Sequence, residues 1–398
     1  MRFSLAPFTF GGYMKKYEVD GCQVYRDDIN IIIETQDGKK EIFELEEEPL
    51  HIGKINIPLS NSCSMKCLYC SESEYNVKSS ISISKNVAFQ IIDEYIMWIS
   101  KYPAITELRL SFDYGGEPVC HLDLLEKISS YFRHKCIEKK LKSIVMMTTN
   151  CAWNSTLLTR VLASVDEIIV SIDGPKEIHE KYRIYKGENS VFELIIKNAL
   201  SIYETGKLKQ ISSVITKDTI ERPEEYVNYF INMFPNCSIK VAAVIVTGDA
   251  KNNNIARIQL NEWNEFIERI KEIAKGKIII IDSKPEKKLE YKYTYGCEHM
   301  RMSNWFCWLD GNISCCTDRE NSNYYIGHVN FETLKMDYSC MSKLEKENNV
   351  ENIEICSVCI AKYYCSGGCP EFRKEKMNCE RRIEKYAKMF TKKIREKG

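Results

Sequence analysis

Two groups of closely spaced cysteines limit what this chain can fold into more than any other feature. The first group is Cys63-x3-Cys67-x2-Cys70. Thiolates held a few residues apart on short turns can bind one soft metal centre. Three thiolates can leave one iron of a cubane open for chemistry, whereas four close a cluster off. The second group has the order Cys297-x18-Cys316, Cys356-x2-Cys359-x5-Cys365-x3-Cys369 and then Cys379. The two groups therefore predict two kinds of iron–sulfur site.

The chain has 18 cysteines among 398 residues, yet it does not look like a disulfide scaffold, because such scaffolds are short and secreted. Its opening residues lack the apolar run of a signal peptide, and no stretch approaches the roughly 20 apolar residues that span a bilayer. We therefore expect a cytoplasmic protein with metal-bound thiolates and no membrane partner. Six isolated cysteines are interpreted as plain core or surface thiols: Cys22, Cys120, Cys136, Cys151, Cys237 and Cys340.

The composition is that of an ordinary globular protein, with 44% hydrophobic and 28% charged residues. The length leaves room for one large catalytic domain and one or two small modules. The formal net charge is zero, so nothing favours nucleic acid or an anionic membrane as a partner.

Between residues 50 and 250, apolar strands alternate with segments of helical periodicity. Six β–α repeats predict an α/β fold whose parallel sheet is doubly wound or curled into a partial (β/α)6 TIM-like barrel. In such folds the chemistry gathers at the carboxyl ends of the strands, and the first cysteine group directly follows the first strand. The expected strands are 54–60, 106–112, 143–149, 167–172, 211–216 and 238–246. The expected helices are 86–101, 122–140, 190–206 and 223–234.

The flanking regions differ from this pattern. Residues 1–49 alternate apolar and polar residues around a turn at 36–39, which predicts a small β-ribbon or sheet, with the remnant of a peptide-recognition domain as an open alternative. Residues 251–291 are expected to connect the parts through a helix at 260–275 and a strand. Residues 292–398 are dense in cysteine and end in a helix, and such a module is held together more by its metals than by an apolar core.

The first cysteine group resembles the signature of the radical S-adenosylmethionine (SAM) enzymes, over residues 52 to about 250. In that family the three thiolates bind a 4Fe–4S cluster, SAM chelates the open iron, and an electron from the cluster cleaves SAM to a 5′-deoxyadenosyl radical. A closed zinc or ferredoxin site would need a fourth ligand nearby, and the next candidate is Cys120 with His121 beside it.

Other short motifs match the SAM-binding elements of the same family. The string Gly115-Gly116-Glu117-Pro118 resembles the element that holds the SAM amino group, with Glu117 as the acceptor. Tyr69 stands where the family places an aromatic residue beside the adenine, and Asn150 ends the third strand.

The stretch from Ser171 to Arg183 resembles the family's Ser-x-Asp-Gly-Pro…His-x-x-x-Arg motif. The resemblance implies that Ser171 contacts the SAM ribose or carboxylate and that Arg183 pairs with the carboxylate. Asp173 either touches substrate or caps the turn, and His179 is interpreted as a packing residue that orients the loop.

The second cysteine group resembles the SPASM extension of radical SAM enzymes that modify peptides and proteins, including the glycine at Gly311. The resemblance implies two auxiliary clusters, and hence three 4Fe–4S clusters in all. Cys297, Cys316 and Cys369 would hold the first auxiliary cluster. For its fourth ligand we expect Cys307, over Cys315 or an open iron. The second would be held by Cys356, Cys359, Cys365 and Cys379.

These features predict an enzyme that cleaves SAM and modifies a ribosomally made peptide, forming an intramolecular thioether or carbon–carbon cross-link. The expected partners are a peptide or protein substrate and an electron donor of the ferredoxin or flavodoxin type. An anaerobic sulfatase maturase, which makes formylglycine, is one alternative, and Asp318 lies near where those enzymes keep an acidic residue. A non-catalytic electron-transfer protein is the other.

Overall fold

The structure is a computed structural model. Cys297 and Asp318 lie outside the residues that it describes. Within the described part of the chain, no helix is long and apolar enough to cross a membrane. The described residues are 3–7, 13–26, 30–48, 51–72, 80–246, 248–282, 291–293, 302–317, 321–338, 340–357, 359–370 and 376–395.

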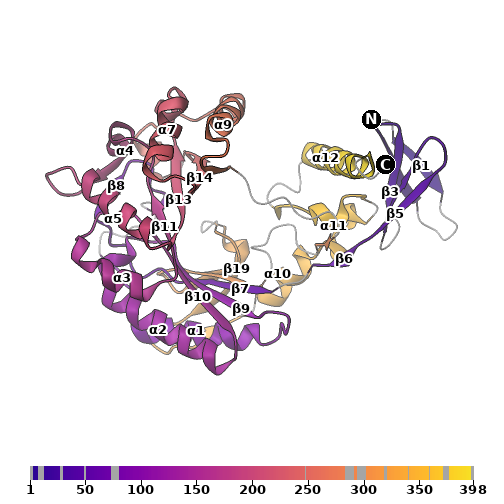
Figure 1. Cartoon of the computed structure of the whole chain (residues 1–398). Helices are drawn as coiled ribbons and strands as arrows, with labels where there is room; N and C mark the ends of the chain where they lie inside the picture. The colour runs from indigo at the N-terminus through magenta and orange to yellow at the C-terminus, as the bar shows by residue number, and fades with distance from the viewer. Residues whose placement is uncertain are drawn as a thin grey trace.

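A curved parallel sheet forms the centre of the larger lobe and confirms the predicted α/β partial barrel (Figure 1). Buried residues such as Leu108, Ile211 and Ile239 alternate along these strands with more exposed residues such as Lys240, so one face carries most of the core. The last strand of the sheet, Ile279–Ile281, pairs in parallel with the strand before it. It lies in residues 251–291, which the sequence predicted to be only a connection between domains. In chain order the strands are β7 (Ile52–Asn56), β9 (Glu107–Phe112), β10 (Lys142–Thr149), β11 (Glu167–Ser171), β13 (Leu208–Ile215), β14 (Ser238–Ala243) and β15 (Ile279–Ile281).

Helices cover the convex side of this sheet (Figure 1). The first of them begins where the Ser84 side chain accepts a hydrogen bond from the Val87 amide, an N-cap that fixes its start. Two helices, α3 (Leu158–Ser164) and α4 (Lys176–Tyr182), have seven residues each and are too short to show a clear period in the sequence. The helices are α1 (Lys85–Ile99), α2 (Leu122–Glu138), α3 (Leu158–Ser164), α4 (Lys176–Tyr182), α5 (Phe192–Glu204), α6 (Lys217–Ile220), α7 (Pro223–Met233) and α9 (Leu260–Ala274).

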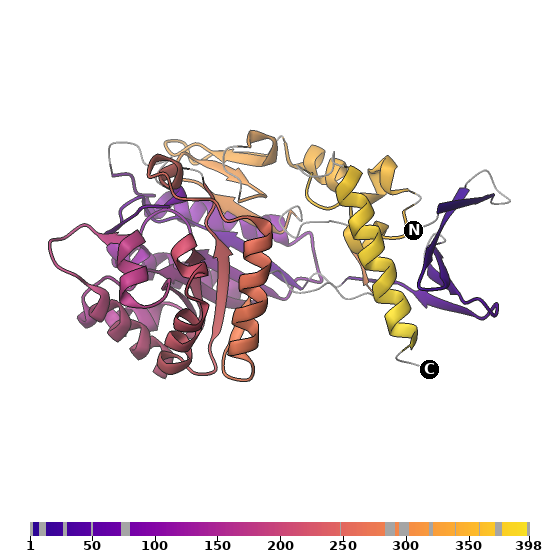
Figure 2. The same cartoon turned by 90° about the horizontal axis from the view of Figure 1, so that it is seen from above.

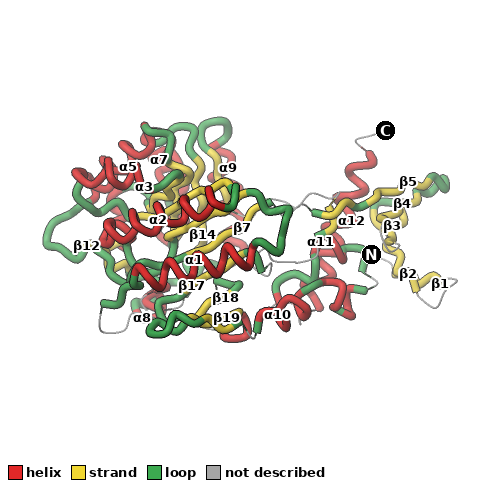
Figure 3. Tube along the Cα trace, turned by 90° about the horizontal axis from the view of Figure 1, so that it is seen from below, coloured by secondary structure: helices red, strands yellow, loops and turns green. Residues whose placement is uncertain are grey.

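The cysteine-rich region begins as an extension of the same sheet. The strand β17 (Asn304–Cys307) pairs in parallel with β7 and covers what would otherwise be an exposed edge. Three short antiparallel strands follow it: β18 (Asn312–Ser314), β19 (Tyr325–Val329) and β20 (Met336–Asp337). Figure 3 shows β17, β18 and β19 beside β7 and α1.

A second lobe joins the two ends of the chain (Figure 2). An antiparallel five-stranded sheet packs against the last helix, α12 (Lys376–Arg395), through a small apolar core that includes Val24, Ile31, Ile33 and Tyr386. The N-terminal sheet is therefore tied to the cysteine-rich region. Its strands are β1 (Phe3–Pro7), β2 (Tyr13–Val19), β3 (Cys22–Arg26), β4 (Asn30–Glu34) and β5 (Lys40–Glu44).

Candidate active site and cluster sites

The first cysteine group lies on a loop at the carboxyl end of β7. Inside this loop, β8 (Met65–Cys67) pairs antiparallel with β12 (Arg183–Tyr185), and Cys67 stands directly opposite Arg183. The Cys70 amide donates to the Cys67 carbonyl at 3.2 Å. The loop is thus held in shape by a two-stranded ribbon and a tight turn.

The glycine loop after β9 packs against the chain that enters the cysteine loop. The Gly116 amide donates to the Ser60 carbonyl at 2.6 Å, and the Glu117 amide donates to the Ser62 carbonyl at 2.8 Å. A Cβ added at Gly116 would lie 1.9 Å from the Ser62 oxygen. A side chain is therefore excluded at Gly116 by the close approach of the Ser62 backbone, in addition to the approach of a ligand that the sequence predicted.

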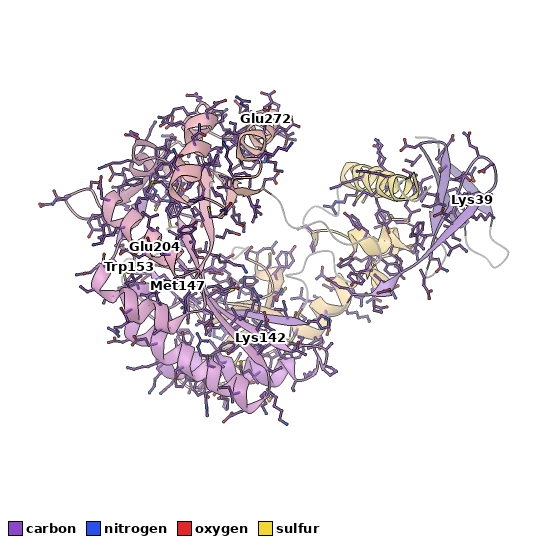
Figure 4. The ribbon with its side chains drawn as sticks, in the orientation of Figure 1. Lys39, Lys142, Met147, Trp153, Glu204 and Glu272 are labelled. Carbon is purple, nitrogen blue, oxygen red and sulfur yellow. The ribbon has the colours of Figure 1, made fainter. Side chains whose placement is uncertain are left out.

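Glu117 is a buried junction between the ends of two neighbouring strands. Its carboxylate accepts hydrogen bonds from the Thr149 hydroxyl at 2.7 Å and from the backbone amide of Asn150 at 2.8 Å. The indole of Trp153, a residue labelled in Figure 4, supports this arrangement by donating to the same hydroxyl at 2.9 Å. Burial raises the pKa of Glu117 to about 7, although the hydrogen bonds from Asn150 and Thr149 lower it.

Asn150 links the third strand of the barrel to the first cysteine. Its side-chain amide lies 3.5 Å from the Cys63 sulfur and 3.4 Å from the Ser64 hydroxyl. The sequence placed Asn150 at the end of a strand but gave no sign of this contact, because it depends on how two distant loops meet.

Asp173 is a buried hub beneath the cysteine loop. The Asp173 carboxylate accepts hydrogen bonds from the Arg183 guanidinium at 2.9 and 3.2 Å and from the backbone amide of Val214 at 2.9 Å. The Tyr69 hydroxyl also donates a hydrogen bond to it. Arg183 also stacks over the Tyr69 ring, 5.5 Å from its centroid, and lies 4.0 Å from the Cys67 sulfur. Among the described residues the carboxylate partner of Arg183 is Asp173, and the contact of Arg183 with the SAM carboxylate stays a prediction.

Two other residues of the same motif surround this hub. Ser171 is half-buried at the end of β11. The His179 ring nitrogen Nδ1 lies 3.4 Å from the Asp173 amide, and burial lowers the pKa of His179 to about 4. The imidazole is therefore neutral at pH 7 and fixes the turn between β11 and α4.

A segment that the sequence reasoning missed covers the cysteine loop. The short helix α8 (Gly248–Asn252) follows β14, and the Asn253 side chain just after it donates to the Leu68 carbonyl at 3.1 Å. Val244, Ala250 and Ile255 pack against Leu68 and Tyr69. No motif marks this segment, because it contributes apolar packing and one side-chain hydrogen bond.

The donor set, three cysteine thiols that lie near one another, fits an iron–sulfur cluster. Within the described ranges, no three His, Cys, Asp or Glu side chains lie close enough to share one metal ion. The ligands of a cubane bind different irons and lie further apart. Burial raises the pKa of Cys67 to about 12 despite the nearby Arg183, so without a metal this thiol keeps its proton at neutral pH.

The four cysteines expected to hold the second auxiliary cluster lie together. Burial raises the pKa of Cys359 to about 12, and Cys356, Cys365 and Cys379 lie close enough to raise it further. These residues surround α11 (Lys362–Cys365) and the start of α12.

The N-terminal sheet supports this group through Arg26. Its guanidinium donates to the Cys359 carbonyl at 3.2 Å and to the Ser357 carbonyl at 2.6 Å. Residues 1–49 therefore contribute directly to the surroundings of the second cysteine group.

Cys307, expected as the fourth ligand of the first auxiliary cluster, is not brought together with Cys316. In the β17–β18 pair, Phe306 stands opposite Ser314 and Cys307 opposite Ile313. Neighbouring residues of a strand point to opposite faces, so Cys307 faces the core on the Tyr95 side, whereas Cys316 lies near Tyr114 on the other side.

The pairing of β17 with β18 therefore argues against the assignment of Cys307. Cys315 offers no replacement, since it is fully buried in the core and its thiol points to the Tyr324 carbonyl. Cys369 is half-buried and follows a turn in which Ser366, Gly367 and Gly368 have left-handed backbone angles.

Comparison with known proteins agrees with this site. A family model described as "4Fe-4S single cluster domain" matches residues 54–191. The serine-type anaerobic sulfatase-maturating enzyme of Bacteroides thetaiotaomicron is 22% identical over 358 residues, which span 79% of this chain and 82% of that enzyme.

Two solved structures share the fold. The structure of anSMEcpe with bound AdoMet and Cp18Cys peptide has a TM-score of 0.57 and 17% identity, covering 86% of this chain and 98% of that one. Streptococcus suis SuiB bound to its precursor peptide SuiA has a TM-score of 0.53 and 19% identity, covering 80% and 72%.

In fold and in the arrangement of its cysteine loop, this chain is similar to radical SAM enzymes. The comparisons confirm the resemblance to radical SAM enzymes with a SPASM extension that was predicted from the cysteine spacing. The family model that matches residues 54–191 describes a 4Fe–4S cluster domain, and anSMEcpe is a structure with bound AdoMet.

Proposed function

We propose that this protein is a radical SAM/SPASM enzyme that forms an intramolecular thioether or carbon–carbon cross-link in a ribosomally synthesised peptide. The observation that carries the proposal is the joining of the cysteine loop, the glycine loop and the end of β10 through Gly116, Glu117 and Asn150. The precursor peptide bound to SuiB supports a peptide substrate.

When bound, the cluster and SAM would supply a reductive cleavage that generates a hydrogen-abstracting radical. The chain's own residues would prepare the site for it. Glu117 would offer a carboxylate to the SAM amino group, and Tyr69 would present its ring to the adenine, held by Asp173 and Arg183. The cover formed by Val244, Ala250 and Ile255 would keep water away from the reacting atoms.

The proposed cofactors are SAM and three 4Fe–4S clusters. The triad Cys63, Cys67 and Cys70 would hold the SAM-binding cluster. The proposed ligands of the auxiliary clusters are Cys297, Cys316 and Cys369 for the first, and Cys356, Cys359, Cys365 and Cys379 for the second.

A sulfatase-maturase activity is the second candidate, favoured by the similarity to a maturase over most of both chains. The two activities differ in product. A maturase converts a single Cys or Ser into formylglycine, and a thioether or carbon–carbon coupling links two residues of one peptide.

The experiment that tests the proposal supplies the anaerobically reconstituted enzyme with SAM, dithionite and candidate peptides. Fragmentation of the product by mass spectrometry then decides. A cross-link between two residues is indicated when the fragment ions from backbone cleavage between those residues are missing. Formylglycine is indicated by an aldehyde that reacts with a hydrazine. SAM cleavage without any peptide product under these conditions would count against both. A chain that carries clusters but cleaves no SAM would be an electron-transfer protein.

A further inference from the structure

A hollow of about 270 Å³ lies between α4, the start of α5 and the ribbon formed by β8 and β12. Figure 1 shows α4, α5 and β8 close together at the outer edge of the larger lobe. Sites that hold whole small molecules usually have volumes of about 300–1,000 Å³. A hollow of this size therefore suits one large side chain better than a whole cofactor.

The floor of the hollow carries a hydrogen-bond donor that lacks an acceptor. His179 lines the hollow and is 1% exposed, and its Nε2 is hydrogen-bonded to no residue that the structure describes. The Asp173 amide donates to the Nδ1 atom of His179 at 3.4 Å, so the neutral imidazole carries its proton on Nε2. Nε2 lies on the ring edge away from Asp173, on the side of the hollow. Because a buried donor without an acceptor is costly, a ligand that supplies an acceptor is favoured here.

Apolar side chains surround this donor. The Phe192 ring meets the His179 imidazole edge-on, with ring centroids 5.2 Å apart. Met65 and Ile195 also line the hollow and are 4% and 1% exposed. The hollow thus suits an apolar ring that ends in a hydrogen-bond acceptor. The tyrosine side chain has this build, since its ring packs against aromatic and aliphatic groups and its hydroxyl oxygen accepts.

The rim of the hollow is polar, and the charges around it nearly balance. Glu180 and Glu188 line the rim, while Lys66 and Lys186 are exposed on and beside the ribbon. Net charge therefore selects no partner. The carboxylate oxygens of the rim accept hydrogen bonds, so the backbone N–H groups of a peptide fit beside a side chain that occupies the hollow.

We infer that this hollow is a docking site for a tyrosine side chain of the peptide substrate, with the phenol oxygen accepting from the Nε2–H group of His179. The inference rests on the proposed function, because that function supplies the peptide. Met65 and Arg183 line the hollow and belong to the ribbon that carries Cys67. A docked tyrosine contacts this ribbon from outside the barrel and leaves the carboxyl ends of the strands free for the residues that react.

The test measures binding without catalysis. Two synthetic pentapeptides blocked at both ends, GGYGG and GGFGG, are titrated into the anaerobically reconstituted protein in a calorimeter. We expect GGYGG to bind about tenfold or more tightly than GGFGG, because only the hydroxyl gives the buried donor an acceptor. Equal affinities, or no binding of either peptide, would overturn the inference.

The variant His179→Phe tests the donor itself. It keeps a ring at this position but removes the Nε2–H group, so the two peptides should bind with equal affinity. A purely structural role of His179 would weaken the binding of both peptides alike and preserve their ratio. A His179→Phe variant that still prefers GGYGG tenfold would show that the hydroxyl binds elsewhere.

A second pair of variants locates the binding site. Val191 lines the hollow, and Val191→Trp should fill it and weaken GGYGG binding by about tenfold or more. The matched control is Ile137→Trp, which adds the same indole at a position that is 73% exposed near the end of α2. It should bind GGYGG as the wild type does. Unchanged binding by Val191→Trp, or an equal loss in the control, would refute the docking site.

The outcome for the hollow is separate from the outcome for the proposed function. A wild type that prefers GGYGG but forms no product from any candidate peptide would refute the proposed function alone. A wild type that forms a cross-linked product but binds neither pentapeptide would refute the docking site alone.

Discussion

Asp173 and Arg183 form a buried ion pair with two contacts, at 2.9 and 3.2 Å, and their side chains are 2% and 10% exposed. The pair joins three parts of the site, since Asp173 also binds Tyr69 of the cysteine loop and the amide of Val214 in β13. Arg183 is thus held in place before any ligand arrives, and SAM would meet an arginine that is already oriented.

Removing Asp173 should be costly for this reason. Asp173→Ala leaves a buried guanidinium without its carboxylate, which typically costs about 3–5 kcal/mol of unfolding free energy. The control is Asp123→Ala, which removes an exposed partner of Arg160 and should change the free energy of unfolding little. Denaturant unfolding under anaerobic conditions measures both. Similar small losses in the two variants would mean that the buried pair does not hold the loop.

Gly116 should tolerate no side chain. In Gly116→Ala the new methyl carbon would lie 1.9 Å from the Ser62 carbonyl oxygen, so the glycine loop must move away from the cysteine loop. We expect a loss of SAM binding by at least tenfold, roughly 1.4 kcal/mol, measured by equilibrium dialysis with the reconstituted protein.

The control for this variant is Gly206→Ala. Gly206 has a φ of +73° and nothing within 4 Å of an added Cβ. It should cost about 1 kcal/mol of stability through backbone strain and leave SAM binding alone. Wild-type SAM affinity in Gly116→Ala would show that the two loops can separate freely.

The buried carboxyl of Glu117 should make stability depend on pH. Burial raises its pKa from 4.5 to about 7, so the folded chain binds more protons than the unfolded chain between these values. The stabilisation is complete below pH 4.5 and is lost as the pH rises through 7. Relative to Glu117→Gln, the wild type should lose up to about 3 kcal/mol of unfolding free energy over this range. A difference between the two proteins that stays constant with pH would contradict the prediction.

Cys307 should behave as a core residue. Cys307→Ala removes a buried thiol from the side of β17 that faces Tyr95, which should cost about 1 kcal/mol or more in packing. Its iron content should stay at the wild-type level, whereas Cys316→Ala should lose about four iron per chain. Iron analysis after anaerobic reconstitution compares the two. Equal losses of iron in the two variants would contradict this, because they would mean that Cys307 reaches the cluster as Cys316 does.

The sequence predicted the barrel well because its strands are long, apolar and regularly spaced. It also placed the triad, Glu117 and Asn150 at the same end of the sheet, since parallel strands end at one edge. It did not predict that Asp173 is the partner of Arg183, or that α8 covers Leu68, because these contacts depend on how separate loops pack. The face of β17 on which Cys307 lies was not predictable for a related reason, since cysteine spacing carries no information about which face of a strand a thiol occupies.

The central claim is that the triad Cys63, Cys67 and Cys70 holds a cluster that cleaves SAM. The most direct measurement is 5′-deoxyadenosine formation by the anaerobically reconstituted protein with dithionite, beside the same protein with all three cysteines changed to alanine. We expect about 12 iron per chain and steady product formation in the wild type, and about 8 iron with no product in the triple variant. A triple variant that keeps all of its iron, or still cleaves SAM, would contradict the account.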